Sequence, residues 1–106
     1  MDGKYKEASE CPITKSVDII GGKWKPIILW VLRNGALRYN EINKEIEGVS
    51  EKVLSQQLTQ LEKSGFVLRQ VEYEKPPKVT YKLSDLGSSF VPVLETMADW
   101  SREKLS

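Results

Sequence analysis

The side chains with the clearest chemical use in this sequence are short, uncharged hydrogen-bonding groups on one expected helix. In the stretch SEKVLSQQLTQLEKSG, residues 50–65, the apolar residues fall at helical spacing. They are Val53, Leu54, Leu58 and Leu61. The opposite face, where an exposed helix usually has Glu and Lys pairs, carries Ser55, Gln56, Thr59 and Gln60. Gln pairs well with adenine in the major groove, and Ser and Thr suit several bases. The pattern therefore predicts reading of base edges, and an idle polar face is the alternative.

Covalent and metal chemistry have few candidates in this chain. Cys11 is the only cysteine, and there is no histidine. These counts exclude an intramolecular disulfide, Cys/His zinc sites and histidine-dependent nucleophilic catalysis. Gly21 and Gly22 form only a pair, not a phosphate-binding loop. We therefore expect no enzyme, no metal and no cofactor.

Length and composition indicate one soluble domain. The chain has 106 residues, of which 40% are apolar and 29% are charged. Its longest strongly apolar run, residues 27–32, is too short to cross a bilayer. We expect a cytoplasmic protein without membrane contact, with a flexible N-terminus over residues 1–10 and a single domain over residues 11–106.

Charge is unevenly distributed along the chain. Residues 1–22 have a net charge of −1, residues 23–82 of +4 and residues 83–106 of −2. A basic middle between acidic ends is typical of a chain whose centre meets phosphates. Chance variation in a mixed surface would explain the same numbers.

Several helices must position the polar face. Ile13, Val17 and Ile20 predict a short helix that ends at Gly21. Residues 23–33 are apolar on nearly all sides and predict a buried central helix, with Trp24 and Trp30 in the core. Asn34 and Gly35 should end that helix, and residues 36–39 suggest an extended connection.

A helix-turn-helix follows. Asn40 is the expected N-cap of a helix over residues 41–47, which Gly48 ends. Ser50 is the expected N-cap of the helix that carries the polar face, and Gly65 ends that helix. Two short helices joined by about three residues with a glycine are typical of this motif.

A hairpin and a long helix complete the chain. Residues 66–74 and 79–83 predict strands, the first with a change of phase that suggests a bulge near residues 69–70. The connection over residues 74–79 carries Lys75 and Lys78, which we expect to contact DNA phosphates. Ser84 should cap the last helix, and Pro92 should kink it.

The order of these elements predicts a mainly α protein with a small β-hairpin, a winged helix-turn-helix. The chain also resembles the HxlR-type transcriptional regulators, which share their architecture with the MarR group. The resemblance rests on the runs CPITKSVDIIGGKW, LRYNEI, VSEKVLSQQLTQLEKSGFV and PPKVTYKLSDLG, and it extends from Cys11 to Trp100.

This resemblance implies a homodimer on a two-fold symmetric double-stranded DNA operator, with N- and C-terminal helices at the dimer interface. It also implies regulation of nearby genes, often by a small-molecule or oxidant effector. The apolar stripe of the last helix, which includes Phe90, Val93, Met97 and Trp100, would serve either the dimer or the core.

The expected DNA contacts come from helix 50–64 and wing 74–79. They are Ser50, Lys52, Ser55, Gln56, Gln57, Thr59, Gln60, Lys75 and Lys78. Two positions depart from the family, whose members often have Arg at position 57 and Pro at position 51. Gln57 lacks that positive charge, and Glu51 places a negative charge near the groove, where it also favours the helix dipole.

Cys11 is a candidate redox sensor or a small packed residue. It lies at the start of the first helix, whose backbone N–H groups and nearby Lys15 favour a thiolate, while Glu10 opposes it. Some family members use a Cys at this position. A single Cys per chain can be oxidised only by linking two subunits or by capping with a small molecule.

Two other function classes stay open. A winged helix used only for protein–protein contact would need an acidic or apolar recognition face, which this chain lacks. A carboxylate-dependent enzyme would need an acid cluster, and only Asp85, Asp99 and Glu103 share a helix face.

Overall fold

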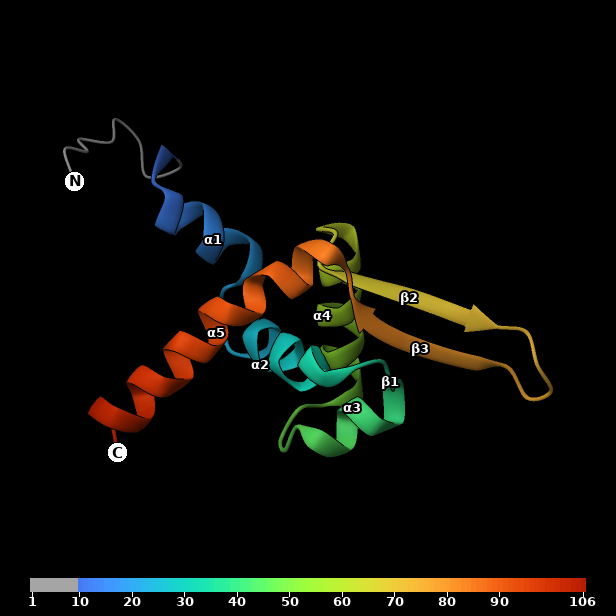
Figure 1. The fold of residues 1–106 in the computed structure, drawn as a ribbon. Helices are drawn as coiled ribbons and strands as arrows, with labels where there is room; N and C mark the ends of the chain where they lie inside the picture. Colours follow the sequence, from blue (N-terminus) through green and yellow to red (C-terminus); the bar gives the residue numbers. More distant parts are fainter. Residues whose placement is uncertain (1–9) are drawn as a thin grey trace.

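The computed structural model describes residues 10–106, so the expected flexible N-terminus lies almost wholly outside the described residues. The elements in chain order are α1 (Pro12–Ile20), α2 (Trp24–Val31), the 3-10 turn η2 (Leu32–Asn34), β1 (Leu37–Arg38), α3 (Tyr39–Glu45), α4 (Glu51–Lys63), β2 (Val67–Glu72), β3 (Lys78–Leu83) and α5 (Asp85–Lys104). The strands form an antiparallel sheet in the order β1-β3-β2. The predicted winged helix-turn-helix is confirmed, with β1 as an added third strand (Figure 1).

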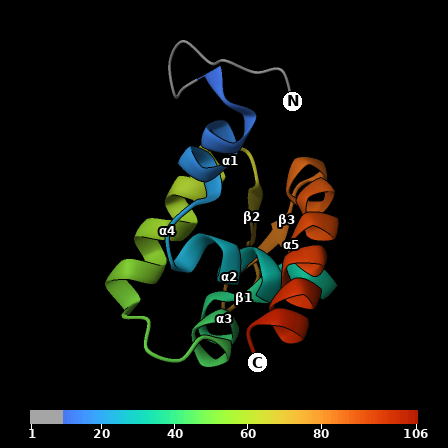
Figure 2. The ribbon, with the colours of Figure 1, turned by 90° about the vertical axis from the view of Figure 1, so that its left-hand side faces the viewer.

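The core lies where α2 passes between α4 and α5 (Figure 2). It includes Ile28 and Leu29 of α2, which are fully buried. Trp24 and Trp30 are only partly buried against this core, and Lys23 and Arg33 lie over their rings. Ile27, also on α2, is 36% exposed. The helix is therefore not buried on all sides, and the two tryptophans lie at the edge of the core.

Two predicted helix boundaries in the helix-turn-helix are wrong. Helix α3 begins at Tyr39 with Arg38 as its N-cap, two residues before the predicted start. Asn40 is not the cap, because the Glu41 carboxylate accepts a 2.8 Å hydrogen bond from the Arg38 backbone N–H. The helix also ends early, at Glu45, because Ile46 leaves the helical conformation and is buried.

The predicted bulge in the first wing strand is absent. Strand β2 pairs with β3 without interruption, from Val67 opposite Leu83 to Glu72 opposite Lys78. The change of apolar phase arises because Phe66 is buried but precedes the strand. Within the strand, Val67 is buried and Leu68 is 45% exposed, as regular alternation requires.

The other predicted caps are confirmed. Ser50 accepts a 3.1 Å hydrogen bond from the Val53 backbone N–H, and Ser84 accepts one of 3.0 Å from that of Gly87. Gly65 follows α4 with a φ of +84°, a conformation that glycine adopts without strain. Helix α5 is continuous and includes Pro92, and the kink expected there stays a prediction.

A close backbone contact joins the start of α5 to the end of α4. The Ser84 hydroxyl donates to the Gly65 carbonyl at 2.5 Å, and the Ser84 N–H donates to the Phe66 carbonyl at 3.0 Å. A β-carbon on Gly87 would lie 2.1 Å from that same Phe66 oxygen. Only glycine therefore allows α5 to pack this closely against the junction.

This contact predicts that Gly87→Ala destabilises the fold. In an unobstructed helix the same change stabilises by about 1 kcal/mol. Here the clash with backbone should reverse the sign and cost about 1–3 kcal/mol or more, measured as the free energy of unfolding in urea. Ser88→Ala, at the exposed next position, should be near neutral. A Gly87→Ala protein as stable as wild type would contradict the contact.

Candidate nucleic-acid interface

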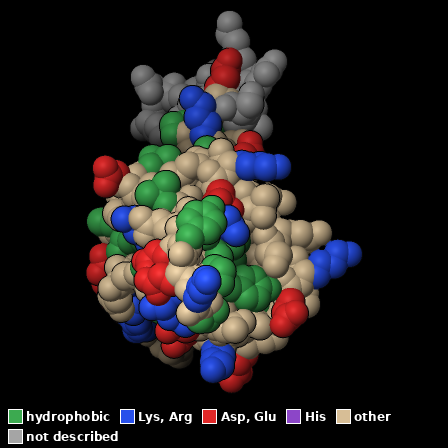
Figure 3. All heavy atoms as spheres, turned by 90° about the vertical axis from the view of Figure 1, so that its right-hand side faces the viewer, with side chains coloured by type: hydrophobic (Ala, Val, Ile, Leu, Met, Phe, Trp, Pro, Cys, Tyr) green, Lys and Arg blue, Asp and Glu red, His purple; other side chains and the backbone are tan. Residues whose placement is uncertain are grey.

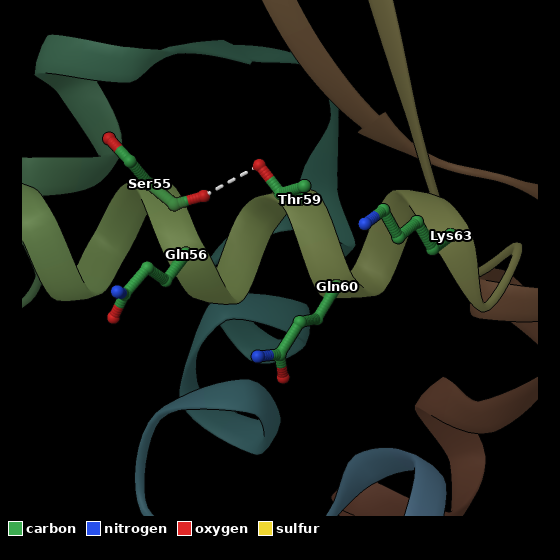
Figure 4. Close-up of a pocket in the computed structure, with 5 residues that line it drawn as sticks. All are labelled: Ser55, Gln56, Thr59, Gln60 and Lys63. Carbon is green, nitrogen blue, oxygen red and sulfur yellow. Dashed lines mark hydrogen bonds between the residues drawn. The ribbon is translucent and has the colours of Figure 1, made fainter.

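The exposed face of α4 is the candidate interface. Leu54, Leu58 and Leu61 are at most 1% exposed, which fixes this side of the helix against the core. The opposite side lines a shallow open hollow, which also includes the unpredicted Lys63 (Figure 4). The lining residues are Ser55, Gln56, Thr59, Gln60 and Lys63. Their spacing of three and four residues would have indicated Lys63 from the sequence.

The polar residues of this face form two rows. Gln56 and Gln60 project to one side of the helix, and Ser55 and Thr59 lie along the other (Figure 4). The Gln56 and Gln60 side-chain amides have no protein hydrogen bond within residues 10–106. Both amides are thus available to a ligand as donors and acceptors together.

The hydroxyl row is tied to the protein. The Thr59 hydroxyl donates to the Ser55 carbonyl at 2.9 Å. The Ser55 hydroxyl donates to Tyr39 Oη at 3.2 Å, and Tyr39 Oη donates to the Glu51 carbonyl at 2.8 Å. Tyr39 at the start of α3 therefore connects to the first turns of α4. Sequence reasoning missed this residue, because no local pattern links positions sixteen residues apart.

The first half of α4 and its N-cap add further polar side chains. Ser50 uses its side-chain oxygen as an acceptor for the Val53 N–H, so its hydroxyl proton is available to a phosphate. Lys52 is exposed on the first turn, beside the exposed Glu51. Gln57 is half-buried and lies outside the hollow, so it is less accessible than its neighbour Gln56.

The wing carries mixed charges. Lys75 lies exposed in the loop, and Lys78 is half-buried in the strand pair opposite the exposed Glu72. The view onto this end of the molecule shows basic, acidic and apolar side chains interspersed (Figure 3). Tyr73, 90% exposed, precedes the loop. The wing therefore carries separate cations among acidic and apolar groups instead of a strongly basic patch.

A second surface lies at the end opposite the wing, where α1 and α5 protrude (Figure 1). These helices border an apolar groove of about 560 Å³. Its apolar lining includes Ile13, Val17, Ile20, Phe90, Val93, Leu94 and Met97. Val17 and Met97 are more than half exposed, at 57% and 52%. Apolar side chains that are exposed together on one surface are typical of a protein–protein contact site.

Cys11 occupies the N-cap position of α1 and is half-buried. Hydrogen bonds from the backbone N–H groups of Thr14 and Ile13 lower the pKa of the thiol below its ordinary value, while partial burial acts in the opposite direction. The helix N-terminus thus favours the thiolate, as the sequence suggested.

A metal site and a membrane-spanning helix have no candidate in this part of the chain. Within residues 10–106, no group of three or more His, Cys, Asp or Glu side chains is placed to hold a metal ion. No helix in the same range is both long enough and apolar enough to cross a membrane.

Comparison with known proteins gives a consistent result. The family model for the HxlR-like helix-turn-helix matches residues 19–106. The HTH-type transcriptional regulator YdeP of Bacillus subtilis is 41% identical over 103 residues, which are 97% of this chain and 80% of YdeP. A MarR-family regulator structure from Porphyromonas gingivalis superposes with a TM-score of 0.88 at 33% identity, covering 95% of this chain and 99% of that one. The oxidized form of the redox regulator HypR superposes with a TM-score of 0.84 at 35% identity, covering 89% of this chain and 97% of that one.

Proposed function

The chain belongs to the HxlR-like helix-turn-helix family and is a winged-helix transcriptional regulator, and from this we propose how it binds. It acts as a homodimer on a two-fold symmetric operator, with helix 50–64 in the major groove and wing 74–79 on the backbone or minor groove. Residues 11–106 work as one domain in the cytoplasm, where the operator lies.

The observation that carries this proposal is the two-sided character of α4. Three fully buried leucines fix one side, so the other side must face outward with uncharged groups that hydrogen-bond. The Gln56 and Gln60 amides match the paired donor and acceptor of adenine in the major groove. Phosphate contacts by Ser50, Lys52, Lys63, Lys75 and Lys78 would position the helix without adding sequence information.

We predict that Gln56→Ala weakens operator binding by about 1–3 kcal/mol, because one bidentate base contact is lost. Binding to random DNA should change little, since phosphate contacts supply it. The operator is first identified by genomic selection of bound DNA. Titration at fixed salt then measures the affinity for the operator and for random DNA. Gln57→Ala makes the same change at the half-buried neighbour and should have a smaller effect. Equal losses on operator and random DNA would refute base reading by Gln56.

The dimer is proposed to form through the α1 and α5 surface. Met97 and Val93 continue an apolar stripe along α5 that the core leaves uncovered, and Val17 extends it onto α1. A stable interface usually buries about 800 Å² per partner. Covering the groove with the same surface of a second copy gives the two-fold symmetry that the operator would share.

Met97→Glu should convert the dimer to a monomer, because it places a charge in an apolar interface. Light scattering at micromolar concentration measures the assembly, and footprinting of the operator should then lose its second half-site. Ser88→Glu adds the same charge at an exposed position of α5 away from the groove and should stay dimeric. A wild-type protein that is monomeric at this concentration would exclude the proposed dimer.

A second candidate function is redox or electrophile sensing by Cys11. It is favoured by the lowered thiol pKa and by the similarity to HypR, a redox regulator solved in an oxidized form. Cys11 precedes α1, a helix that borders the proposed dimer surface. With diamide, two Cys11 thiols from two subunits would give one disulfide, and their two hydrogen atoms would reduce diamide to its hydrazine. A small-molecule electrophile would instead cap each thiol.

Operator titration with and without diamide tests this role. We predict that oxidation changes the operator affinity of wild type and leaves that of Cys11→Ser unchanged, because no other thiol is present. Nonreducing electrophoresis distinguishes linked from capped subunits. If the oxidant has no effect on wild type, or affects both proteins equally, Cys11 has a packing role only.

A further inference from the structure

The hydroxyl protons on the α4 face are directed into the protein. Tyr39 Oη lies 2.8 Å from the Glu51 carbonyl oxygen, which can only accept, so the phenol proton must point there. The Ser55 hydroxyl lies 3.2 Å from the phenol oxygen and must therefore be the donor of that pair. Thr59 Oγ1 lies 2.9 Å from the Ser55 carbonyl oxygen and donates to it for the same reason.

Toward a ligand, these two hydroxyls can act only as hydrogen-bond acceptors. A hydroxyl has one proton and two acceptor lone pairs, and both Ser55 and Thr59 are exposed at the hollow of α4. In the major groove, the N6 amino group of adenine and the N4 amino group of cytosine are donors. Guanine N7 and O6 and thymine O4 only accept. A hydroxyl that can only accept forms a hydrogen bond with the amino groups of adenine and cytosine, and it is repelled by the acceptors of guanine and thymine.

We propose that Ser55 and Thr59 select adenine or cytosine at the two base positions that they contact, and that Tyr39 is the positioning residue that sets Ser55 in this mode. This inference rests on the proposed function, because it requires α4 to lie in the major groove. It adds the chemical class of base, which the residue types alone leave open, since free Ser and Thr hydroxyls suit several bases.

The test begins with selection of bound duplexes from a random library by the full-length protein. Ser55→Ala and Thr59→Val should each remove the preference at one base pair of the motif. Every base pair presents an adenine or cytosine amino group on one strand and a guanine or thymine acceptor on the other, so base analogues must identify the contacted group. Loss of a single neutral hydrogen bond should reduce affinity about three- to tenfold. Replacing that adenine by purine, which lacks the amino group, should give the same loss, as should 2-pyrimidinone for a cytosine. Replacement by 7-deaza-adenine, which keeps the amino group, should have no effect.

Tyr39→Phe separates positioning from mere structural support. Without the phenol oxygen, the Ser55 proton is free to donate, so guanine or thymine should become acceptable at the Ser55 position only. The preference at the Thr59 position should stay, and so should binding to random DNA. Tyr81→Phe is the matched control on β3. The Tyr81 hydroxyl forms no hydrogen bond within residues 10–106, so its removal should leave the motif unchanged.

The outcomes distinguish the two proposals. If no motif is selected, the proposed sequence-specific function fails, and the inference fails with it. If a motif is selected but Ser55→Ala and Thr59→Val leave it unchanged, only the inference is overturned. The same holds if purine binds as well as adenine, or if Tyr39→Phe lowers affinity equally at every position.

Discussion

The burial of Leu54, Leu58 and Leu61 against α2 is the constraint on which the rest of the structure depends. Each fully buried leucine contributes about 1.5–3 kcal/mol relative to exposure, and their spacing allows one rotational setting of α4. That setting turns Gln56 and Gln60 outward. The reading surface is therefore a consequence of core packing. A rotation of α4 that altered this surface would also expose the buried leucines and so destabilise the core.

The junction around Phe66 extends this constraint to the other end of the molecule. The same carbonyl oxygen of Phe66 accepts from Ser84 and limits Gly87, so α5 starts directly against the end of α4. The wing strand β2 leaves from the same point. The three surfaces proposed for base reading, phosphate contact and dimer formation thus meet at one hydrogen-bonded junction.

Local signals in the sequence were sufficient for most of this architecture. Caps at Ser50 and Ser84 and the stop at Gly65 depend on side chains within a few residues, and all three are confirmed. The errors arose where a neighbouring element decided the outcome. Helix α3 starts early because Arg38 is already extended in β1, and Phe66 is buried by the junction without belonging to the strand. The Tyr39–Ser55 bond could not be predicted, because it exists only once the two helices are folded together.

The mixed charge of the wing has a consequence for the salt dependence of DNA binding. Release of counterions from DNA scales with the number of phosphates that cations neutralise. In the proposed complex, Glu72 and Glu74, which are close to Lys75 and Lys78 in the sequence, would lower the number of counterions that the wing releases. Affinity for any DNA sequence would then fall less steeply with salt than it does with a wing that carries cations alone.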